Sequence, residues 1–373
     1  MTVLGTPERA AGATALGAEA ARALAAAGLD SDGVVRAVRA ALDEDFRYGP
    51  DVTSAATVAG RTVTAAVVAR EAGVVAGLPV ALAVFDLIAD YLGDWAEVAV
   101  EPASGQVRDT SGPDLGPKYP ESLGKELRGA GEGRTTATAA GPVVTAAGRE
   151  AAEVRVTVTA LVADGARVRA GDAVLRVSGD AVAVLGAERT MLNFLTHLSG
   201  IASATRQWAD AVDGTGAVVR DTRKTLPGLR SLEKYAVRCG GGENHRMGLG
   251  DAALIKDNHV AAAGGVAAAV RAVRAAARAG LVIEVECDSV AQVREALAAG
   301  ARFILLDNMP APILREAVAV ARSYDGVRLE ASGGLRLENA REVASTGVDY
   351  LSVGGLTHSA RALDLGLDYS GAG

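Results

Sequence analysis

VIEVECDSVAQVREALAAGARFILLDN, residues 282–308, joins two short apolar runs through a segment with helical spacing. The runs 282–285 and 303–306 are rich in Val, Ile, Leu and Phe, which is typical of buried strands. The intervening residues 290–299 mix Ala, Leu and Val with polar residues, which favours an amphipathic helix. A strand, a helix and a second strand in this order predict two parallel strands joined by a helical crossover.

The same pattern recurs on both sides of this segment, from residue 186 onward. Four further apolar runs indicate strands, at 217–220, 253–255, 327–329 and 350–353. Each strand ends in a polar or glycine group. Successive ends are 30, 21, 25 and 22 residues apart, counted between Lys256, Glu286, Asp307, Ser332 and Gly354. One βα unit of a barrel has a similar length, since about 250 residues make eight units. We therefore predict a parallel α/β sheet, open or closed into a barrel.

Polar groups at the carboxyl ends of successive barrel strands converge on one mouth, where such folds carry out chemistry. Polar residues also end strands for no functional reason, and at any single position that explanation is the better one. Six strands in a row favour a functional site.

The preceding residues have a different pattern. Residues 31–185 contain period-2 runs such as 62–68 and 154–158, which predict half-exposed strands of a separate domain. Within them, 104–150 is rich in Gly, Pro and charge, and we interpret it as a long, mobile insertion. Residues 1–30 are expected to form a weakly structured, Ala-rich extension.

Composition narrows the possible partners. With 49% hydrophobic and 22% charged residues the chain resembles a globular protein, while 3% aromatics and a net charge of −7 argue against nucleic acid and anionic membranes as partners. The two cysteines, Cys239 and Cys287, indicate a reducing compartment and are expected to be packing thiols. No secretory signal is recognisable, and the apolar run 260–270 is too short to span a bilayer. We expect a cytoplasmic protein.

Residues 221–259 concentrate positive charge on this acidic chain. They hold seven of its 38 Lys and Arg residues and three of its five lysines. A solvated helix over 223–238, with Glu233 in ion pairs, would explain Arg230 and Arg238. It does not explain Arg223-Lys224 at a strand end or the glycine-rich segment 240–246. These fit a pocket for several carboxylate or phosphate oxygens.

Nine short motifs stand out along the chain: ERTMLN (188–193), SGIA (199–202), DTRKTLPGLR (221–230), NHR (244–246), IKDNH (255–259), EVE (284–286), LDN (306–308), ASGG (331–334) and GGLTHS (354–359). Together they closely resemble the nicotinate-nucleotide pyrophosphorylase (carboxylating) family, the quinolinate phosphoribosyltransferases. The likeness runs from about residue 31 to 368. The insertion and the N-terminal extension depart from the family pattern without touching a motif.

The resemblance implies an N-terminal α/β sandwich domain, residues 31–185, beside a TIM-like, incomplete α/β barrel, residues 186–373. It implies transfer of phosphoribose from 5-phosphoribosyl-1-pyrophosphate to quinolinate, with loss of CO2, in de novo NAD biosynthesis. It also implies Mg²⁺ as cofactor, and a homodimer (or a higher oligomer) whose active sites are shared between subunits.

The resemblance further implies roles for individual residues. The quinolinate-binding set comprises Arg189 (reaching in from the partner subunit), Arg223, Lys224, His245, Arg246 and Lys256. Glu286 and Asp307 form the acidic pair that faces the ribose and Mg²⁺, directly or through water. The phosphate-end loops contain Ser332, Gly333, Gly334, Gly354, Gly355 and His358.

The residue chemistry agrees with these roles. Two adjacent carboxylates need several cations when buried, and Mg²⁺ prefers oxygen ligands. We expect Lys224, Glu286 and Asp307 to be catalytic. His197 is expected to be structural, and His259 either caps a strand end or touches substrate. Glu284 is expected to point away from the mouth if Glu286 points toward it.

Three alternatives remain at this stage. A Schiff-base aldolase would use Lys224 or Lys256 as its amine. A transferase acting on nicotinate is disfavoured, because the number of cations suits a dicarboxylate better. An anion-binding sensor would use the same pocket without turnover, but nothing in the acidic pair requires it.

Overall fold

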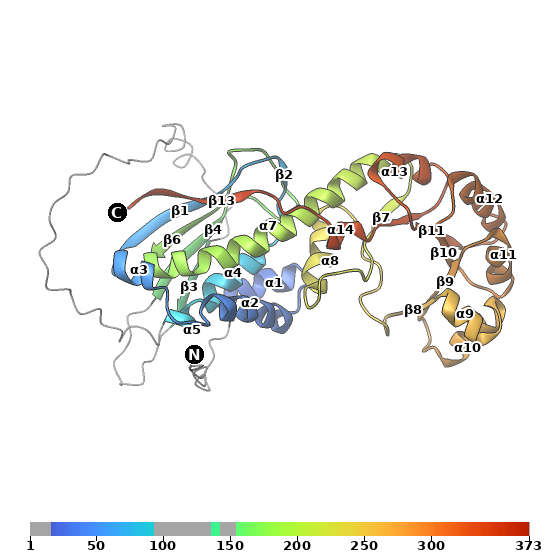
Figure 1. Cartoon of the computed structure of the whole chain (residues 1–373), viewed down its shortest axis with the longest axis horizontal. Helices are drawn as coiled ribbons and strands as arrows, with labels where there is room; N and C mark the ends of the chain where they lie inside the picture. Colours follow the sequence, from blue (N-terminus) through green and yellow to red (C-terminus); the bar gives the residue numbers. More distant parts are fainter. Residues whose placement is uncertain (1–15, 93–135, 142–153, 373) are drawn as a thin grey trace, which may run out of the picture.

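The computed structural model describes residues 16–92, 136–141 and 154–372. It is elongated, with an antiparallel sheet and its helices at one end and a parallel α/β unit at the other (Figure 1). The long helix α7 (Ala181–Val212) runs between the two ends. Its first turn is capped by Asp180, whose Oδ1 accepts from the backbone N–H of Ala183 at 2.9 Å.

The antiparallel sheet has the strand order β13-β1-β6-β4-β3. Its strands are β1 (Thr62–Ala69), β3 (Thr136–Gly141), β4 (Val154–Ala160), β6 (Ala173–Asp180) and β13 (Leu365–Ala372). Two short strands pair separately, β2 (Gly73–Val74) and β5 (Arg167–Val168). The remaining helices at this end are α1 (Ala18–Ala26), α2 (Ser31–Asp45), α3 (Val52–Thr57), α4 (Leu78–Leu87) and α5 (Ala89–Leu92). The strands predicted at 62–68 and 154–158 are confirmed as β1 and β4.

The second sheet has six parallel strands in the order β7-β12-β11-β10-β9-β8. They are β7 (Val218–Arg220), β8 (Ala252–Ile255), β9 (Val282–Cys287), β10 (Phe303–Asp307), β11 (Arg328–Ser332) and β12 (Tyr350–Ser352). The first strand pairs with the last, as in a closed barrel, but β7 and β8 are not paired. The predicted incomplete barrel is therefore confirmed, and its seam lies between β7 and β8.

Helices connect and cover these strands (Figure 1). They are α8 (Arg230–Cys239), α9 (Asp257–Ala263), α10 (Val266–Ala276), α11 (Val290–Ala298), α12 (Ala311–Ala321), α13 (Leu337–Ala344) and α14 (Gly355–His358). The predicted helix at 290–299 is α11, where Ser289 caps the first turn and Val293, Ala296 and Leu297 are buried. No helix in the described ranges is long and apolar enough to cross a bilayer.

The structure differs from the predicted domain bounds at three places. Helix α1 lies inside the extension expected to be weakly structured, and its Leu24 is buried where α1 packs on α4. Strand β3 lies inside the predicted insertion 104–150, whose other residues are outside the described part. Strand β13, placed by sequence in the barrel domain, pairs with β1 in the first sheet.

Candidate active site

The register of the parallel strands aligns their polar ends. Asp307 of β10 pairs with Ser332 of β11, which pairs with Ser352 of β12, which pairs with Arg220 of β7. One step deeper, Leu305 pairs with Glu286 of β9 on one side and with Glu330 of β11 on the other. The carboxyl ends of these strands therefore form one polar mouth, as the sequence predicted.

Unpaired cations line the seam side of this mouth. Arg223 and Lys224 follow β7, and Arg246 precedes β8 across the seam. Within the described residues, none of the three forms an ion pair with a carboxylate, and the buried Nε of Arg223 has no hydrogen-bond partner. Burial, and then the positive charge of Arg223, lower the pKa of Arg246. The carboxylates of Asp251 and Glu284 only partly oppose this shift. Cations held close together without a carboxylate in direct contact favour an anionic ligand.

Lys256 and the acidic pair lie on the neighbouring strand ends. The Lys256 ammonium is 3.8 Å from the Glu286 carboxylate. Burial raises the pKa of Glu286, Lys256 opposes that rise, and the charge of Asp307 adds to it. Asp307 accepts a 2.8 Å hydrogen bond from the side chain of Asn308. The sequence-predicted pair is therefore brought together on adjacent strands β9 and β10.

The glycine loops after β11 and β12 enclose a cavity of about 380 Å³. Its lining includes every predicted phosphate-end residue together with Lys224: Ser332, Gly333, Gly334, Gly354, Gly355 and His358. Gly333 has φ +81°, and a Cβ there would lie 2.2 Å from Oδ1 of Asn308. Trp208 and Arg361 also line the cavity, and the sequence analysis missed both: Trp208 belongs to the distant helix α7, and Arg361 lies just beyond the last family motif.

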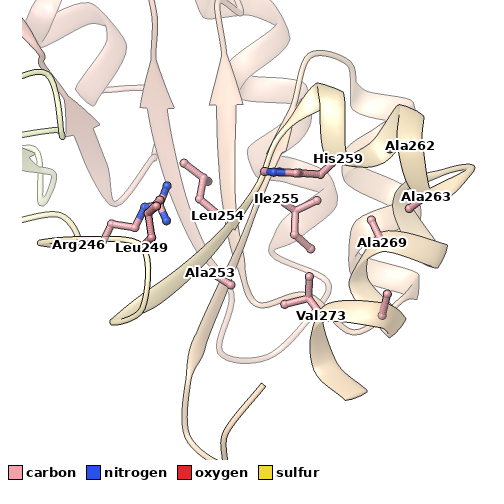
Figure 2. Close-up of a pocket in the computed structure, with 11 residues that line it drawn as sticks. Arg246, Leu249, Ala253, Leu254, Ile255, His259, Ala262, Ala263, Ala269 and Val273 are labelled. Atoms are coloured by element: carbon pink, nitrogen blue, oxygen red, sulfur yellow. The ribbon is translucent and has the colours of Figure 1, made fainter. Parts of the chain in front are cut away.

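A second cavity of about 540 Å³ lies against β8, between Arg246 and helices α9 and α10. Figure 2 shows Arg246 and Leu249 on one side of this strand and His259 with the alanines of α9 on the other. The Nδ1 of His259 accepts a 3.0 Å hydrogen bond from the backbone N–H of Lys256. Of the two roles left open by the sequence, the structure gives His259 the capping role.

His245 is directed into the barrel. Its Nε2 is 2.8 Å from Glu284 and 3.4 Å from Glu330, while its Nδ1 accepts from the backbone N–H of Arg246 at 2.8 Å. Burial opposes the protonated imidazole, but the hydrogen bond to Glu284 and the charge of Glu330 outweigh it and raise the pKa of His245. Both ring nitrogens therefore have protein partners. The imidazole lies beneath the cationic wall, which is formed by Arg223, Lys224 and Arg246.

The expectation for Glu284 was wrong. Residues two apart on a strand share a face, so Glu284 points into the barrel with Glu286, where it is buried beside His245. The sequence also gave no role to Glu330, which pairs with Arg220 at 2.9 Å and accepts from the hydroxyl of Ser352. The i, i+2 spacing of the two glutamates was the signal that could have placed Glu284.

His245, Glu284 and Glu330 lie close enough together to hold a metal ion. The guanidinium of Arg220 already neutralises Glu330, and the imidazole bonds Glu284. Charge compensation within the protein therefore accounts for this cluster, and the acidic pair at the mouth is the better candidate for a cation.

Arg189 is the one predicted site residue that a single chain does not bring to the mouth. It is an exposed residue near the start of α7, which lies along the first sheet (Figure 1). About 22 Å of helix, at 1.5 Å per residue, separates it from Ala204, a residue of α7 that lines the cavity of the glycine loops.

The expectations for the histidine and cysteines outside the mouth agree with the structure. His197 on α7 pairs with the buried Glu233 at 2.9 Å, which is a structural role. Burial raises the pKa of both Cys239 and Cys287 to about 12, so both thiols stay protonated at neutral pH.

Comparisons with known proteins place this geometry in one family. Residues 128–199 match the model of the quinolinate phosphoribosyl transferase N-terminal domain, and residues 201–368 match that of the C-terminal domain. The nicotinate-nucleotide pyrophosphorylase [carboxylating] of Mycobacterium leprae is 47% identical over 335 residues, which cover 89% of this chain and 95% of that protein. A probable enzyme of the same name from Bacillus subtilis is 45% identical over 55% of this chain and 70% of that protein.

Solved structures of the same family are similar to this chain over most of its length. The nicotinate-nucleotide pyrophosphorylase from Francisella tularensis matches with a TM-score of 0.70 and 31% identity, over 92% of this chain and 98% of that one. The structure of NadC from Streptococcus pyogenes matches with a TM-score of 0.69 and 34% identity, over 92% and 99%. The chain therefore belongs to the quinolinate phosphoribosyltransferase family, the carboxylating nicotinate-nucleotide pyrophosphorylases.

Proposed function

We propose that this chain is a decarboxylating quinolinate phosphoribosyltransferase. It converts quinolinate and 5-phosphoribosyl-1-pyrophosphate to nicotinate mononucleotide, CO2 and pyrophosphate, a step of NAD biosynthesis. The observation that carries the proposal is the set of unpaired cations, Arg223, Lys224 and Arg246, beside an acidic pair and two glycine loops. Family membership supports this substrate pair, because a relative at 47% identity is named as a carboxylating nicotinate-nucleotide pyrophosphorylase.

Quinolinate would bind against the cationic wall. Arg223 and Arg246 suit bidentate grips on its two carboxylates, and their mutual repulsion is relieved when an anion lies between them. Lys256 would bind a single carboxylate oxygen. His245, with both ring nitrogens already bonded, would support the backbone of Arg246 from below.

The phosphoribosyl donor would lie across the acidic pair and the glycine loops. Backbone N–H groups of Gly333, Gly334 and Gly355 would cradle the 5′-phosphate in the 380 Å³ cavity, a common use of the last barrel loops. The ribose would then face Glu286 and Asp307. These carboxylates would steady positive charge that develops on the ribose as its bond to pyrophosphate breaks.

Glu286 and Asp307 fit a magnesium ion. Both offer oxygen ligands on adjacent strands, and the charge of Asp307 raises the pKa of Glu286 in a way that a cation would offset. The chemistry that Mg²⁺ would supply there is positive charge to offset that of the departing pyrophosphate.

The ring nitrogen of quinolinate would form the new bond to the ribose carbon as the bond to pyrophosphate breaks. The nitrogen then carries positive charge, so the adjacent carboxylate leaves as CO2 and its bonding electron pair remains on the ring carbon. Lys224, which lines the cavity of the glycine loops, would stabilise this carbanion-like centre and donate the proton that replaces CO2.

The test is incubation of the purified protein with quinolinate, phosphoribosyl pyrophosphate and Mg²⁺. We expect nicotinate mononucleotide and CO2 in equal amounts, and neither product in the presence of a chelator. Quinolinate binding without products would reject the transferase and favour an anion sensor. A covalent adduct trapped by borohydride with a carbonyl substrate would favour an aldolase.

The assembly that we propose is a cytoplasmic homodimer with shared active sites. Its support is the position of Arg189, which is exposed near the start of α7 and about 22 Å along the helix from Ala204 at the cavity of its own chain. A second copy that places this residue at the barrel mouth completes the cationic pocket.

A further inference from the structure

Helix α8 carries two adjacent charged side chains that are completely buried. Glu233 and Lys234 both have 0% exposure. Burying a charge is costly unless partners compensate it, so the partners of these residues indicate what the helix does. Both residues bind segments that carry the cations of the site, and Figure 1 shows α8 between α7 and those segments.

Lys234 joins the two sides of the barrel seam. Its ammonium bonds the carboxylate of Asp221, directly after β7, and donates a 2.9 Å hydrogen bond to the backbone carbonyl of His245. Asp221 in turn accepts from the backbone N–H of His245 at 2.9 Å and from the side chain of Asn244 at 2.5 Å. The same Asn244 amide also donates to the carbonyl of Lys234 at 2.7 Å.

The first turn of α8 forms further hydrogen bonds to the same two segments, the one after β7 and the one before β8. Glu233 accepts a 3.1 Å hydrogen bond from the backbone N–H of Leu226, two residues after Lys224. Arg230 donates to the hydroxyl of Thr225 and to the carbonyl of Met247, each at 3.1 Å. One short helix therefore fixes the segment that carries Arg223 and the segment that carries Arg246.

Stability alone does not explain the buried pair. Replacing a buried ion pair by apolar side chains of similar volume is often neutral or stabilising. A hydrogen-bonded ion pair, unlike an apolar contact, fixes the relative positions of the backbone groups that it joins. The buried pair therefore fits a role in fixing the relative positions of the two sides of the seam.

We infer that Lys234 and Asp221 are positioning residues, which set the spacing between the Arg223 and Arg246 sides of the quinolinate pocket. This inference rests on the proposed function. The phosphate-end loops follow β11 and β12 and do not bond to the pair directly; Thr357 after β12 donates to the carbonyl of Lys224 at 2.9 Å. Loss of the pair is therefore expected to weaken quinolinate binding much more than binding of the phosphoribosyl donor.

The experiment compares the full-length protein with the double variant Asp221→Asn/Lys234→Met. Both new side chains are neutral and close in size, so no uncompensated charge is left buried, but Met cannot donate to the carbonyl of His245. We expect an unfolding midpoint near that of the unmodified protein. We also expect the calorimetric Kd for quinolinate to rise about 10- to 100-fold, with little change in the KM for phosphoribosyl pyrophosphate.

Two further variants complete the design. Asn244→Ala removes a half-buried member of the network and is expected to weaken quinolinate binding in the same direction. Tyr235→Phe is the matched control on the same helix, since its hydroxyl donates to Asp164 at 2.6 Å and touches neither segment. It is expected to lower the unfolding midpoint and to leave the Kd for quinolinate unchanged.

The outcomes separate the inference from the proposed function. Unchanged quinolinate binding in the folded double variant rejects the positioning role, as does an equal loss of affinity for both substrates. If the double variant does not fold, Asn244→Ala with normal quinolinate binding rejects it. Failure of the unmodified protein to bind quinolinate rejects the proposed function.

Discussion

Lys224 combines two properties that the proposed reaction needs. It is exposed at the mouth without a carboxylate partner among the described residues, and it lines the cavity formed by the glycine loops. The ammonium of a lysine can release a proton, whereas the guanidinium of an arginine cannot do so in a protein. Charge and proton donation at this position can therefore be tested separately.

We predict that Lys224→Ala lowers kcat by about 100- to 10,000-fold, the usual contribution of a positioned proton donor. Lys224→Arg keeps the positive charge, so it should retain quinolinate binding and still lose most turnover. Single-turnover measurement of CO2 release checks both variants. Normal turnover in Lys224→Arg would remove proton donation by this residue from the mechanism.

Asp86 gives a prediction about stability. Burial raises its pKa from 3.8 to about 6, the N–H of Gly17 opposes the rise, and the charge of Glu19 adds to it. Between about pH 4 and pH 6 the folded state therefore binds more protons at Asp86 than the unfolded state does. The contribution of Asp86 to the free energy of unfolding is largest below about pH 4. Its contribution is lost as the pH rises through 6.

The variant Asp86→Asn should therefore be more stable than the unmodified protein at pH 7, and the difference should shrink toward pH 4. Asparagine still accepts the 2.8 Å hydrogen bond from Gly17 but carries no charge to bury. Denaturant unfolding at several pH values provides the measurement. A difference that does not depend on pH would contradict the raised pKa.

At the level of secondary structure, the packing of helix α7 depends on a close contact between its backbone at Gly200 and the segment before β13. Gly200 lies in the middle of this 32-residue helix. A Cβ there would lie 2.2 Å from the backbone oxygen of Arg361 and 2.9 Å from Cα of Ala362. The adjacent N–H of Leu363 donates to the carbonyl of Thr196 at 2.9 Å, so this segment, which leads into β13, lies directly against α7.

We predict that Gly200→Ala lowers the free energy of unfolding by about 1–3 kcal/mol, the usual cost of overpacking. A loss of stability would be informative, because helix propensity alone predicts a gain of about 1 kcal/mol when alanine replaces glycine. Gly250→Ala is the control, because a Cβ there meets nothing within 4 Å. Urea denaturation compares the two, and a Gly200→Ala variant as stable as the control would contradict this packing.

At the level of the whole molecule, the proposed dimer predicts complementation between two inactive variants. If Arg189 serves the partner's site, a heterodimer of Arg189→Ala and Lys224→Ala contains one site with both changes and one with neither. Random mixing makes about half of the dimers mixed, so about a quarter of the original activity should return. Mixing after mild denaturation and assay of nicotinate mononucleotide measures this. Absence of any recovery, with mixed dimers demonstrated, would place Arg189 in its own chain's site or outside both.

Much of the site was predictable because barrel strands bring their ends together. Glu286, Asp307 and Ser332 each end an apolar run, and a parallel sheet places such ends at one edge. Side-chain partners were less predictable. Lys234 was counted with the other cations of residues 221–259, yet it is completely buried against Asp221. His245 was expected to touch quinolinate, yet both ring nitrogens bond to the protein.

The sequence by itself determined the βα repeat, the polar strand ends and the family motifs, because periodicity and spacing are local properties of the chain. Only the tertiary structure decided that β13 returns to the first sheet and that the barrel is open between β7 and β8. It also decided that Glu233 and Lys234 are buried and that Ala204 and Trp208 of α7, but not Arg189, line the cavity of the glycine loops. These features depend on contacts between residues remote in sequence, which local patterns do not encode.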